Sequence, residues 1–388
     1  MSNKPAIRFV DFTDVWEQRK LSDLAEIVGG GTPDTNNPAY WDGDIDWYAP
    51  AEMEGQRYAT SSVRKITELG LQKSSAKMLP AHRTVLFTSR AGIGKMAILQ
   101  RSAATNQGFQ SMVLKDGTDP YFIYSMGNKI KDKAEGVASG STFLEISGKM
   151  LGNLEIMVPA LAEQKEIASF FRGIDDLITL QLRKYEKLKQ FKSSMLSKMF
   201  PCEGENVPEI RFAGFTNAWE QRKVSEICSI STGKSNTQDK IDDGEYPFYV
   251  RSPIIERSNI YLYDEEAVLT VGDGVGTGKV FHYVNGKYDL HQRVYRLFDF
   301  SDDVDAKFFY HWFSENFYDR VMSMTAKTSV DSVRLEMIAD MEMNAPSYDE
   351  QKKISGYMDH LDSLITLHHC KLDKLKQFKS AILSKMFV

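Results

Sequence analysis

Two glycine-rich stretches carry the side chains best suited to bind a phosphate or the edge of a base. The first is SRAGIGK (89–95) and the second is GDGVGTGK (272–279), and alternating apolar runs that predict β-strands lead into both. Glycines in such a loop let the backbone approach a ligand closely, while the lysine or arginine beside them supplies positive charge. Neither stretch is a P-loop, because the residue after the lysine is Met96 or Val280 and not Ser or Thr.

A second set of polar side chains follows each stretch after about one hairpin. It consists of Asn106–Gln107 in the first half of the chain and His291–Gln292–Arg293 in the second half. Asn, Gln and Arg form bidentate hydrogen bonds with adenine or guanine edges. The alternatives are that Asn106 and Gln107 cap a turn and that His291 is a structural histidine. The candidate binding residues are Ser89, Arg90, Gly92, Gly94, Lys95, Asn106, Gln107, Gly272, Gly274, Gly276, Lys279, His291, Gln292 and Arg293.

Two other motifs were weighed as catalytic or metal sites. NPAY (37–40) is similar to the N-P-P-Y motif that holds a flipped adenine, but it lacks the second proline and has no glycine-rich cofactor motif upstream. His368, His369 and Cys370 are consecutive, so on a helix they point to different sides and do not converge on a metal ion. We therefore predict that this chain has no catalytic residue and no metal ligand.

The elements that must position the candidate residues are repeated along the chain. Glu163–Phe200 aligns with Glu350–Phe387 without a gap, with 22 identities in 38 positions. A second repeat opens each half, as RFVDFTDVWEQRK from Arg8 and RFAGFTNAWEQRK from Arg211. Between these anchors the two halves have little in common. Repetition at this scale predicts a duplication with pseudo-symmetry, in which each half is a variable domain followed by a shared segment.

The shared segment is predicted to be one long helix, because its apolar side chains recur at spacings of three, four or seven. At about 1.5 Å per residue each copy would be about 55 Å long. Since the first helix ends where the second domain begins, we expect the two copies to pack antiparallel, which also sets acidic starts against basic ends. The apolar stripe comprises Ile167, Phe171, Ile174, Ile178, Leu188, Ile354, Leu361, Ile365, Leu375 and Ile382.

Composition limits the class of protein. With 42% hydrophobic and 26% charged residues the chain has the make-up of a globular protein. A net charge of −5 argues against a uniformly basic nucleic-acid binder but permits local basic surfaces. The chain shows neither a membrane-length apolar run nor a signal peptide, so we expect a cytoplasmic protein. Three cysteines without a CxxC pair predict neither a disulfide framework nor a zinc ribbon.

The plan of variable domain, shared helix, variable domain and shared helix is similar to that of the DNA-specificity subunit of type I restriction–modification systems. The similarity covers essentially the whole chain and includes local signatures as well as the duplicated frame. These signatures are GGTPDTNNPAYWDGDIDWYAP (30–50), LFTSRAGIGKMAILQRSAATNQGFQSMVL (86–114), VLTVGDGVGTGKVFHYVNGKYDLHQRVYRL (268–297) and the P-x-x-x-E-Q-K patterns that begin at Pro159 and Pro346.

The resemblance implies an α+β fold, with two pseudo-symmetric α/β target-recognition domains separated by two long helices packed as an antiparallel coiled coil. The expected boundaries are 1–158 for the first recognition domain, 159–200 for the first spacer helix, 201–210 for a linker, 211–345 for the second recognition domain and 346–388 for the second spacer helix.

The resemblance also implies a function. Each domain would read one half of an asymmetric bipartite DNA site through the candidate binding residues, and the helices with their apolar stripe would dock two modification subunits. The chain itself is expected to be non-catalytic and to bind no cofactor, while S-adenosylmethionine, ATP and Mg²⁺ are implied for the modification and restriction subunits. An alternative is a scaffold or decoy that binds modification subunits without reading DNA, but glycine-rich loops in both halves argue against it.

Overall fold

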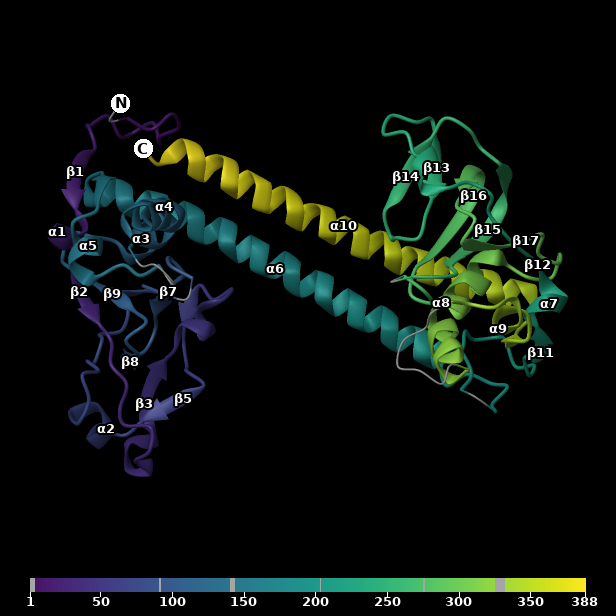
Figure 1. Cartoon of the computed structure of the whole chain (residues 1–388), viewed down its shortest axis with the longest axis horizontal. Helices are drawn as coiled ribbons and strands as arrows, with labels where there is room; N and C mark the ends of the chain where they lie inside the picture. The colour runs from purple at the N-terminus through teal and green to yellow at the C-terminus, as the bar shows by residue number, and fades with distance from the viewer. Residues whose placement is uncertain (1–3, 91, 140–143, 203, 275, 325–331) are drawn as a thin grey trace. The chain divides into compact units, whose positions relative to one another are not determined.

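The computed structural model describes residues 4–90, 92–139, 144–202, 204–274, 276–324 and 332–388. Ala91 and Val275 of the glycine-rich stretches and Glu203 of the predicted linker lie outside this set. The chain divides into two compact units, and Figure 1 labels the elements of each. Unit 1 comprises Met1–Gln181 with Lys371–Val388, and unit 2 comprises Leu182–Cys370. Within the described ranges, no helix combines the length and the apolar character needed to cross a bilayer.

The described part of unit 1 contains a five-stranded, a three-stranded and a two-stranded sheet. The five-stranded sheet has the order β2 (Ala25–Gly29), β9 (Gln110–Leu114), β6 (Thr84–Phe87), β7 (Met96–Leu99) and β4 (Tyr58–Ala59). The smaller sheets are β5 (Arg64–Ile66), β3 (Trp41–Tyr48) and β8 (Ala103–Thr105), and β1 (Glu17–Lys20) with β10 (Glu155–Val158). The helices are α1 (Leu21–Leu24), α2 (Glu68–Gln72), α3 (Pro120–Ser125), α4 (Gly127–Val137), α5 (Gly148–Gly152), the start of α6 (Leu161–Met199) and the end of α10 (Tyr348–Met386).

The described part of unit 2 follows the same plan with one large sheet. Its order is β12 (Ser229–Thr232), β17 (Val294–Phe298), β15 (Tyr263–Val271), β16 (Phe281–Leu290), β13 (Tyr246–Tyr249) and β14 (Ile255–Ser258). A two-stranded sheet pairs β11 (Glu220–Lys223) with β18 (Glu342–Ala345). The helices are α7 (Val224–Ile227), α8 (Ala306–Ser323) and α9 (Leu335–Ala339), with the end of α6 and the start of α10.

The difference in sheet number has a local cause. In unit 2 the ten-residue strand β16 pairs with both β15 and β13, so the sheet is continuous. In unit 1 the corresponding stretch is interrupted between β7 and β8, so the two pairings belong to separate sheets.

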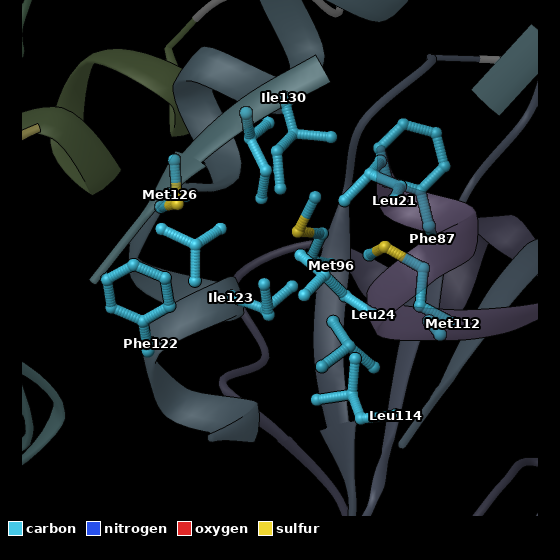
Figure 2. Close-up of a cluster of buried hydrophobic side chains, with 14 of the residues drawn as sticks. Leu21, Leu24, Phe87, Met96, Met112, Leu114, Phe122, Ile123, Met126 and Ile130 are labelled. Carbon is cyan, nitrogen blue, oxygen red and sulfur yellow. The ribbon is translucent and has the colours of Figure 1, made fainter. Parts of the chain in front are cut away.

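The main core of unit 1 lies between one face of the five-stranded sheet and α3 and α4, and Figure 2 shows part of it. Phe87, the last residue of β6, and Met96, the first of β7, are both buried in this cluster. The glycine-rich stretch runs between these two residues. Both ends of the loop are therefore anchored in the core, and the hydrophobic effect keeps its backbone in place.

Both shared segments form single helices of 39 residues, α6 and α10, as predicted. Within unit 1 the Lys379 ammonium near the end of α10 lies 2.6 Å from the Asp175 carboxylate near the start of α6. Within unit 2 Lys192 and Asp362 form the equivalent ion pair, also at 2.6 Å. The start of each helix therefore packs along the end of the other, which confirms the antiparallel prediction and the pairing of acidic starts with basic ends.

The repeated RF…W and E-Q-K motifs bind each other. In unit 1 the Arg8 guanidinium donates to both carboxylate oxygens of Glu163 at 2.7 Å, and the indole of Trp16 donates to one of them at 3.3 Å. In unit 2 Arg211 binds both oxygens of Glu350 at 2.7 Å in the same way. The carboxylates are almost fully buried, and these bidentate pairs fasten the first residues of each half to the start of its helix.

Candidate nucleic-acid interface

In unit 1 the candidate residues gather around the turn that follows β8. Strand β8 runs parallel to β3, and this pairing continues into the turn because the Asn106 amide donates to the Tyr48 carbonyl at 3.0 Å. The Asn106 side chain closes the turn by accepting the Gly108 amide at 2.8 Å. Asn106 is thus a turn cap, one of the two roles left open by the sequence, and the side chain of Gln107 projects from the exposed tip.

The glycine-rich loop of unit 1 closes on Thr88. Its hydroxyl donates to the Gly92 carbonyl at 2.6 Å and accepts the Lys95 amide at 2.9 Å. Gly92 and Gly94 have φ values of 100° and 88°, so a side chain at either position would be strained. The Ser89 amide donates to the Gly108 carbonyl at 2.8 Å, which joins this loop to the turn.

A third segment completes the cluster in unit 1. The Gly31 amide donates to the Thr105 carbonyl at 2.8 Å, and a Cβ on Gly30 would lie 1.9 Å from the Asn106 carbonyl oxygen. This close approach brings the hydroxyl of Thr32 to the Gln107 side-chain oxygen, to which it donates. This segment lies in the signature 30–50, although residue type alone indicates no role for Gly30 or Thr32.

Unit 2 repeats the main hydrogen bonds of this backbone frame. The His291 amide donates to the Tyr249 carbonyl of β13 at 3.0 Å, as Asn106 does to Tyr48. The ring of His291 accepts the Arg293 amide at 3.0 Å and caps the turn. The Gly272 amide donates to the Arg293 carbonyl at 2.8 Å and so occupies the place of Ser89. His291 is therefore a buried structural histidine, which is one of the two roles that the sequence leaves open for it.

The third segment is also matched in unit 2. The Lys234 and Ser235 amides both donate to the Leu290 carbonyl at 3.1 Å, as Gly31 does to Thr105 in unit 1. A Cβ on Gly233 would lie 2.1 Å from the Leu290 carbonyl oxygen. The next polar side chain, Asn236, accepts a hydrogen bond from the Gln292 amide. Gly233 and Asn236 are therefore further site residues that sequence patterns alone had not indicated.

The remaining candidate binding residues of unit 2 differ in their exposure to solvent. Gly272 and Gly276 are buried, whereas Gly274 is exposed with a φ of 83°. Lys279 is exposed, and its ammonium lies 4.8 Å from the centre of the Tyr318 ring, a cation–π contact. The two loops therefore share their anchoring but differ in the side chains that they present.

The charges around the two clusters also differ. In unit 1 Arg90 is half-buried, and the Lys95 ammonium lies 3.2 Å from the Glu54 carboxylate. In unit 2 Asp273 lies between two guanidinium groups, 3.3 Å from Arg251 and 3.7 Å from Arg293.

Burial of the His291 ring lowers its pKa, and the positive charges of Arg251 and Arg293 add to this effect. The neutral ring matches its use as an acceptor for the Arg293 amide, because a protonated imidazole would have no lone pair for that bond.

Ser89 has no exposed surface, and its hydroxyl has no hydrogen-bond partner among the described atoms. Its matched residue Gly272 carries no side chain. Each cluster contains a glutamine amide, a lysine ammonium and at least one guanidinium, which is chemistry for binding a polar or anionic ligand.

Half of the apolar stripe residues of α6 and α10 are core residues of the two units. Ile167, Phe171 and Ile174 belong to the core of unit 1, and Ile354 and Leu361 belong to that of unit 2, all of them buried. The other five stripe residues, which are half-buried, are Ile178, Leu188, Ile365, Leu375 and Ile382. The partner-binding role expected for the stripe stays a prediction.

Both units of the chain are similar to known proteins. The family described as "Type I restriction modification DNA specificity domain" matches residues 13–190 and 217–377. The specificity subunit of the type I restriction enzyme MjaIX from Methanocaldococcus jannaschii is 29% identical over 286 residues, which cover 66% of this chain and 65% of the relative, just under two thirds. The EcoR124I/EcoR124II specificity subunit of Escherichia coli is 28% identical over 167 residues, which cover 42% of this chain and 41% of that subunit.

Solved structures agree at the level of the fold. The S subunit of a type I restriction–modification system from M. genitalium superposes with a TM-score of 0.69 at 15% identity, covering 99% of both chains. A chain from a structural study of type I complex assembly gives a TM-score of 0.55 at 16% identity, covering 96% of this chain and 97% of the other. These likenesses support an α+β fold with two globular domains and paired long helices. On the family match, which spans most of both units, the chain belongs to the family of type I restriction modification DNA specificity domains.

Proposed function

We propose that this chain is the DNA-specificity subunit of a type I restriction–modification complex and that each unit reads one half of a bipartite target. The observation that carries the proposal is the pair of loop clusters built on one backbone frame. That frame presents Asn106–Gln107–Gly108 in unit 1 and His291–Gln292–Arg293 in unit 2. Because the two clusters share one backbone frame, both can dock on DNA in the same way. Because they present different side chains, they would read different base edges, and the target would be asymmetric.

The partner subunits are proposed to dock on apolar side chains that α6 and α10 leave exposed. In the repeat, Leu180 is equivalent to Leu367 and Phe191 to Phe378, and all four are 46–48% exposed. Two copies of one modification subunit would therefore meet the same kind of surface twice. In this proposal S-adenosylmethionine, ATP and Mg²⁺ are bound by the partner subunits, and this chain contributes recognition without catalysis.

The long helices are proposed to act as the spacer between the two half-sites. Each helix of 39 residues is about 58 Å long at about 1.5 Å per residue. B-DNA repeats every ~34 Å, so recognition in two major-groove segments would leave central base pairs without a base contact. The spacer would then have a fixed length and no specified sequence.

The competing function is a scaffold or decoy that binds modification subunits without reading DNA. A scaffold or decoy would need the helices but not the loop clusters. It would therefore have no use for the close glycine contacts that both clusters contain. The two functions therefore differ in one measurable outcome, which is the presence of a modified DNA motif.

The test is to co-express the full chain with its modification subunit in a methylation-free host and to map N6-methyladenine across the genome. The proposal expects one asymmetric motif with a gap of fixed length. The modification subunit expressed alone is the control and is expected to give no such motif. A stable complex of the two subunits that leaves the genome without a motif would favour the scaffold and overturn the proposal.

A further inference from the structure

The turns at residues 106–108 and 291–293 hold one glutamine each at the same place in the frame. Gln107 and Gln292 both follow the residue whose amide extends the β3–β8 or β13–β16 pairing. Both are exposed, whereas the residue before each of them caps the turn with its side chain. The two turns have only the glutamine in common in sequence, so the equivalence of Gln107 and Gln292 is visible only in the tertiary structure.

Neighbouring polar groups of the turns are already engaged in the fold. Asn106 and His291 each accept the amide two residues further along the chain. Arg293 is exposed, but its guanidinium lies beside the Asp273 carboxylate and its matched residue in unit 1 is Gly108. The glutamine is therefore the polar side chain that both turns offer to a ligand.

Each glutamine amide is held by a side chain from the third segment of its cluster. Thr32 binds the amide of Gln107, and Asn236 binds that of Gln292. Because a glutamine side chain loses much rotamer freedom on binding, holding it beforehand lowers the cost of an ordered contact. Thr32 directly follows Gly31, whose amide donates to Thr105, and Asn236 directly follows Lys234 and Ser235, whose amides both donate to the equivalent Leu290 carbonyl.

A glutamine side-chain amide that forms one hydrogen bond can still form others. A primary amide has two N–H donors and two acceptor lone pairs, so an amide with one neighbour keeps at least one N–H and one lone pair. That combination matches the adenine edge in the major groove, where N6 donates and N7 accepts. A guanine edge offers two acceptors there and a cytosine edge one donor, so neither pairs with both groups.

We infer that Gln107 and Gln292 are equivalent base-reading residues and that each reads an adenine, one in each half of the bipartite site. This inference rests on the proposed function and adds to it the base class and the residue that reads it. It predicts that the two half-sites, although different in sequence, each contain an A·T pair whose recognition depends on one glutamine.

The experiment uses the full chain with its modification subunit, as in the methylation map above, and compares wild type with Gln107→Ala and Gln292→Ala. Gln107→Ala is expected to relax one A·T position in one half-site and to leave the other half-site intact. Gln292→Ala is expected to do the same in the opposite half-site. Since a good bidentate pair discriminates by about 1–3 kcal/mol, the preference for the A·T pair should fall roughly 5- to 150-fold.

Three further variants make the test more specific. Gln107→Glu replaces a donor and acceptor by acceptors alone, so the relaxed position is expected to favour cytosine, whose N4 donates. Gln18→Ala and Gln221→Ala are the matched controls, because these exposed glutamines occupy equivalent positions in β1 and β11, away from the clusters. The controls are expected to keep the wild-type motif.

The outcomes separate this inference from the proposed function. A clear wild-type motif that Gln107→Ala and Gln292→Ala leave unchanged would overturn the inference alone. So would a variant that relaxes a G·C position or weakens both half-sites equally while the complex remains assembled. A wild-type chain without any motif would overturn the proposed function, and the inference with it.

Discussion

At the scale of single residues, a buried carboxylate holds each half of the chain to its helix. Glu163 is 1% exposed, and both of its oxygens are occupied by the Arg8 guanidinium, 155 positions away in the sequence. The hydrogen bond to Glu163 raises the pKa of Arg8, so the guanidinium stays charged. A buried charge is tolerated only while it is paired, which makes this contact sensitive to substitution.

Removing Arg8 should therefore destabilise unit 1 strongly. We expect Arg8→Ala to lower the free energy of unfolding by about 3 kcal/mol, because it leaves Glu163 buried without its counter-charge. Urea titration followed by tryptophan fluorescence measures the change. Lys165→Ala, an exposed position on the same helix, is the control and should stay within about 0.5 kcal/mol of wild type. Equal losses in the two variants would contradict the account.

A second residue-scale prediction concerns the acid stability of unit 2. A hydrogen bond with His311 and the Lys307 ammonium at 2.5 Å lower the pKa of Asp359 from 3.8 to about 2. Because the folded pKa lies below the unfolded one, the ionised carboxylate stabilises the fold above about pH 4. This contribution is lost as the pH falls towards 2.

Replacement of Asp359 by Asn tests the sign of this effect. We expect Asp359→Asn to be less stable than wild type at pH 6 and to approach the stability of wild type as the pH falls below 3. Urea midpoints at pH 6, 4 and 2.5 measure the difference. Asp243→Asn, an exposed position in the same unit, should show no such convergence. A difference that grows on acidification would refute the assignment.

At the scale of elements, the antiparallel helix pair is specified by charges near both ends. Asp175 is 12% exposed and accepts both the Lys379 ammonium at 2.6 Å and the Tyr121 hydroxyl at 2.7 Å. The sequence repeat places an equivalent pair, Lys192 with Asp362, in unit 2. A parallel arrangement would set acidic starts beside acidic starts, so these pairs also disfavour the wrong orientation.

A charge swap between the helices tests this pairing. Asp175→Lys and Lys379→Asp should each destabilise unit 1, and the double variant should recover part of the loss. We expect a coupling free energy of about 0.5–3 kcal/mol in a double-mutant cycle, since the residues are in contact. Combining Lys379→Asp with Glu166→Lys, an exposed residue on α6, is the comparison and should be additive. Additive losses in the first cycle would rule out the contact.

At the scale of the whole molecule, the proposed spacer makes a prediction about the target DNA. Four residues inserted at matched points of α6 and α10 add about one turn, or about 6 Å, to each helix. We expect the complex to recognise the same two half-sites with a longer gap, as measured by the methylation map. An insertion outside the helices, in the 201–210 linker, is the control and should leave the gap unchanged. Loss of one half-site at an unchanged gap would refute the spacer role.

The sequence by itself determined the features that depend on local pattern or on repetition. The period of the apolar residues predicted both 39-residue helices, and the shared motifs predicted two related halves. These predictions succeed because helix geometry places residues three and four apart on one face.

The tertiary structure alone decided which side chains are available. It assigned Asn106 and His291 to turn capping and buried Ser89, although residue type made all three look like binding groups. It also joined Thr32 to Gln107 across 75 positions and placed five of the ten apolar stripe residues in the cores of the two units. Residue type shows which hydrogen bonds a side chain can make. Only the folded chain shows which of them are already satisfied, because the partners lie far apart in sequence.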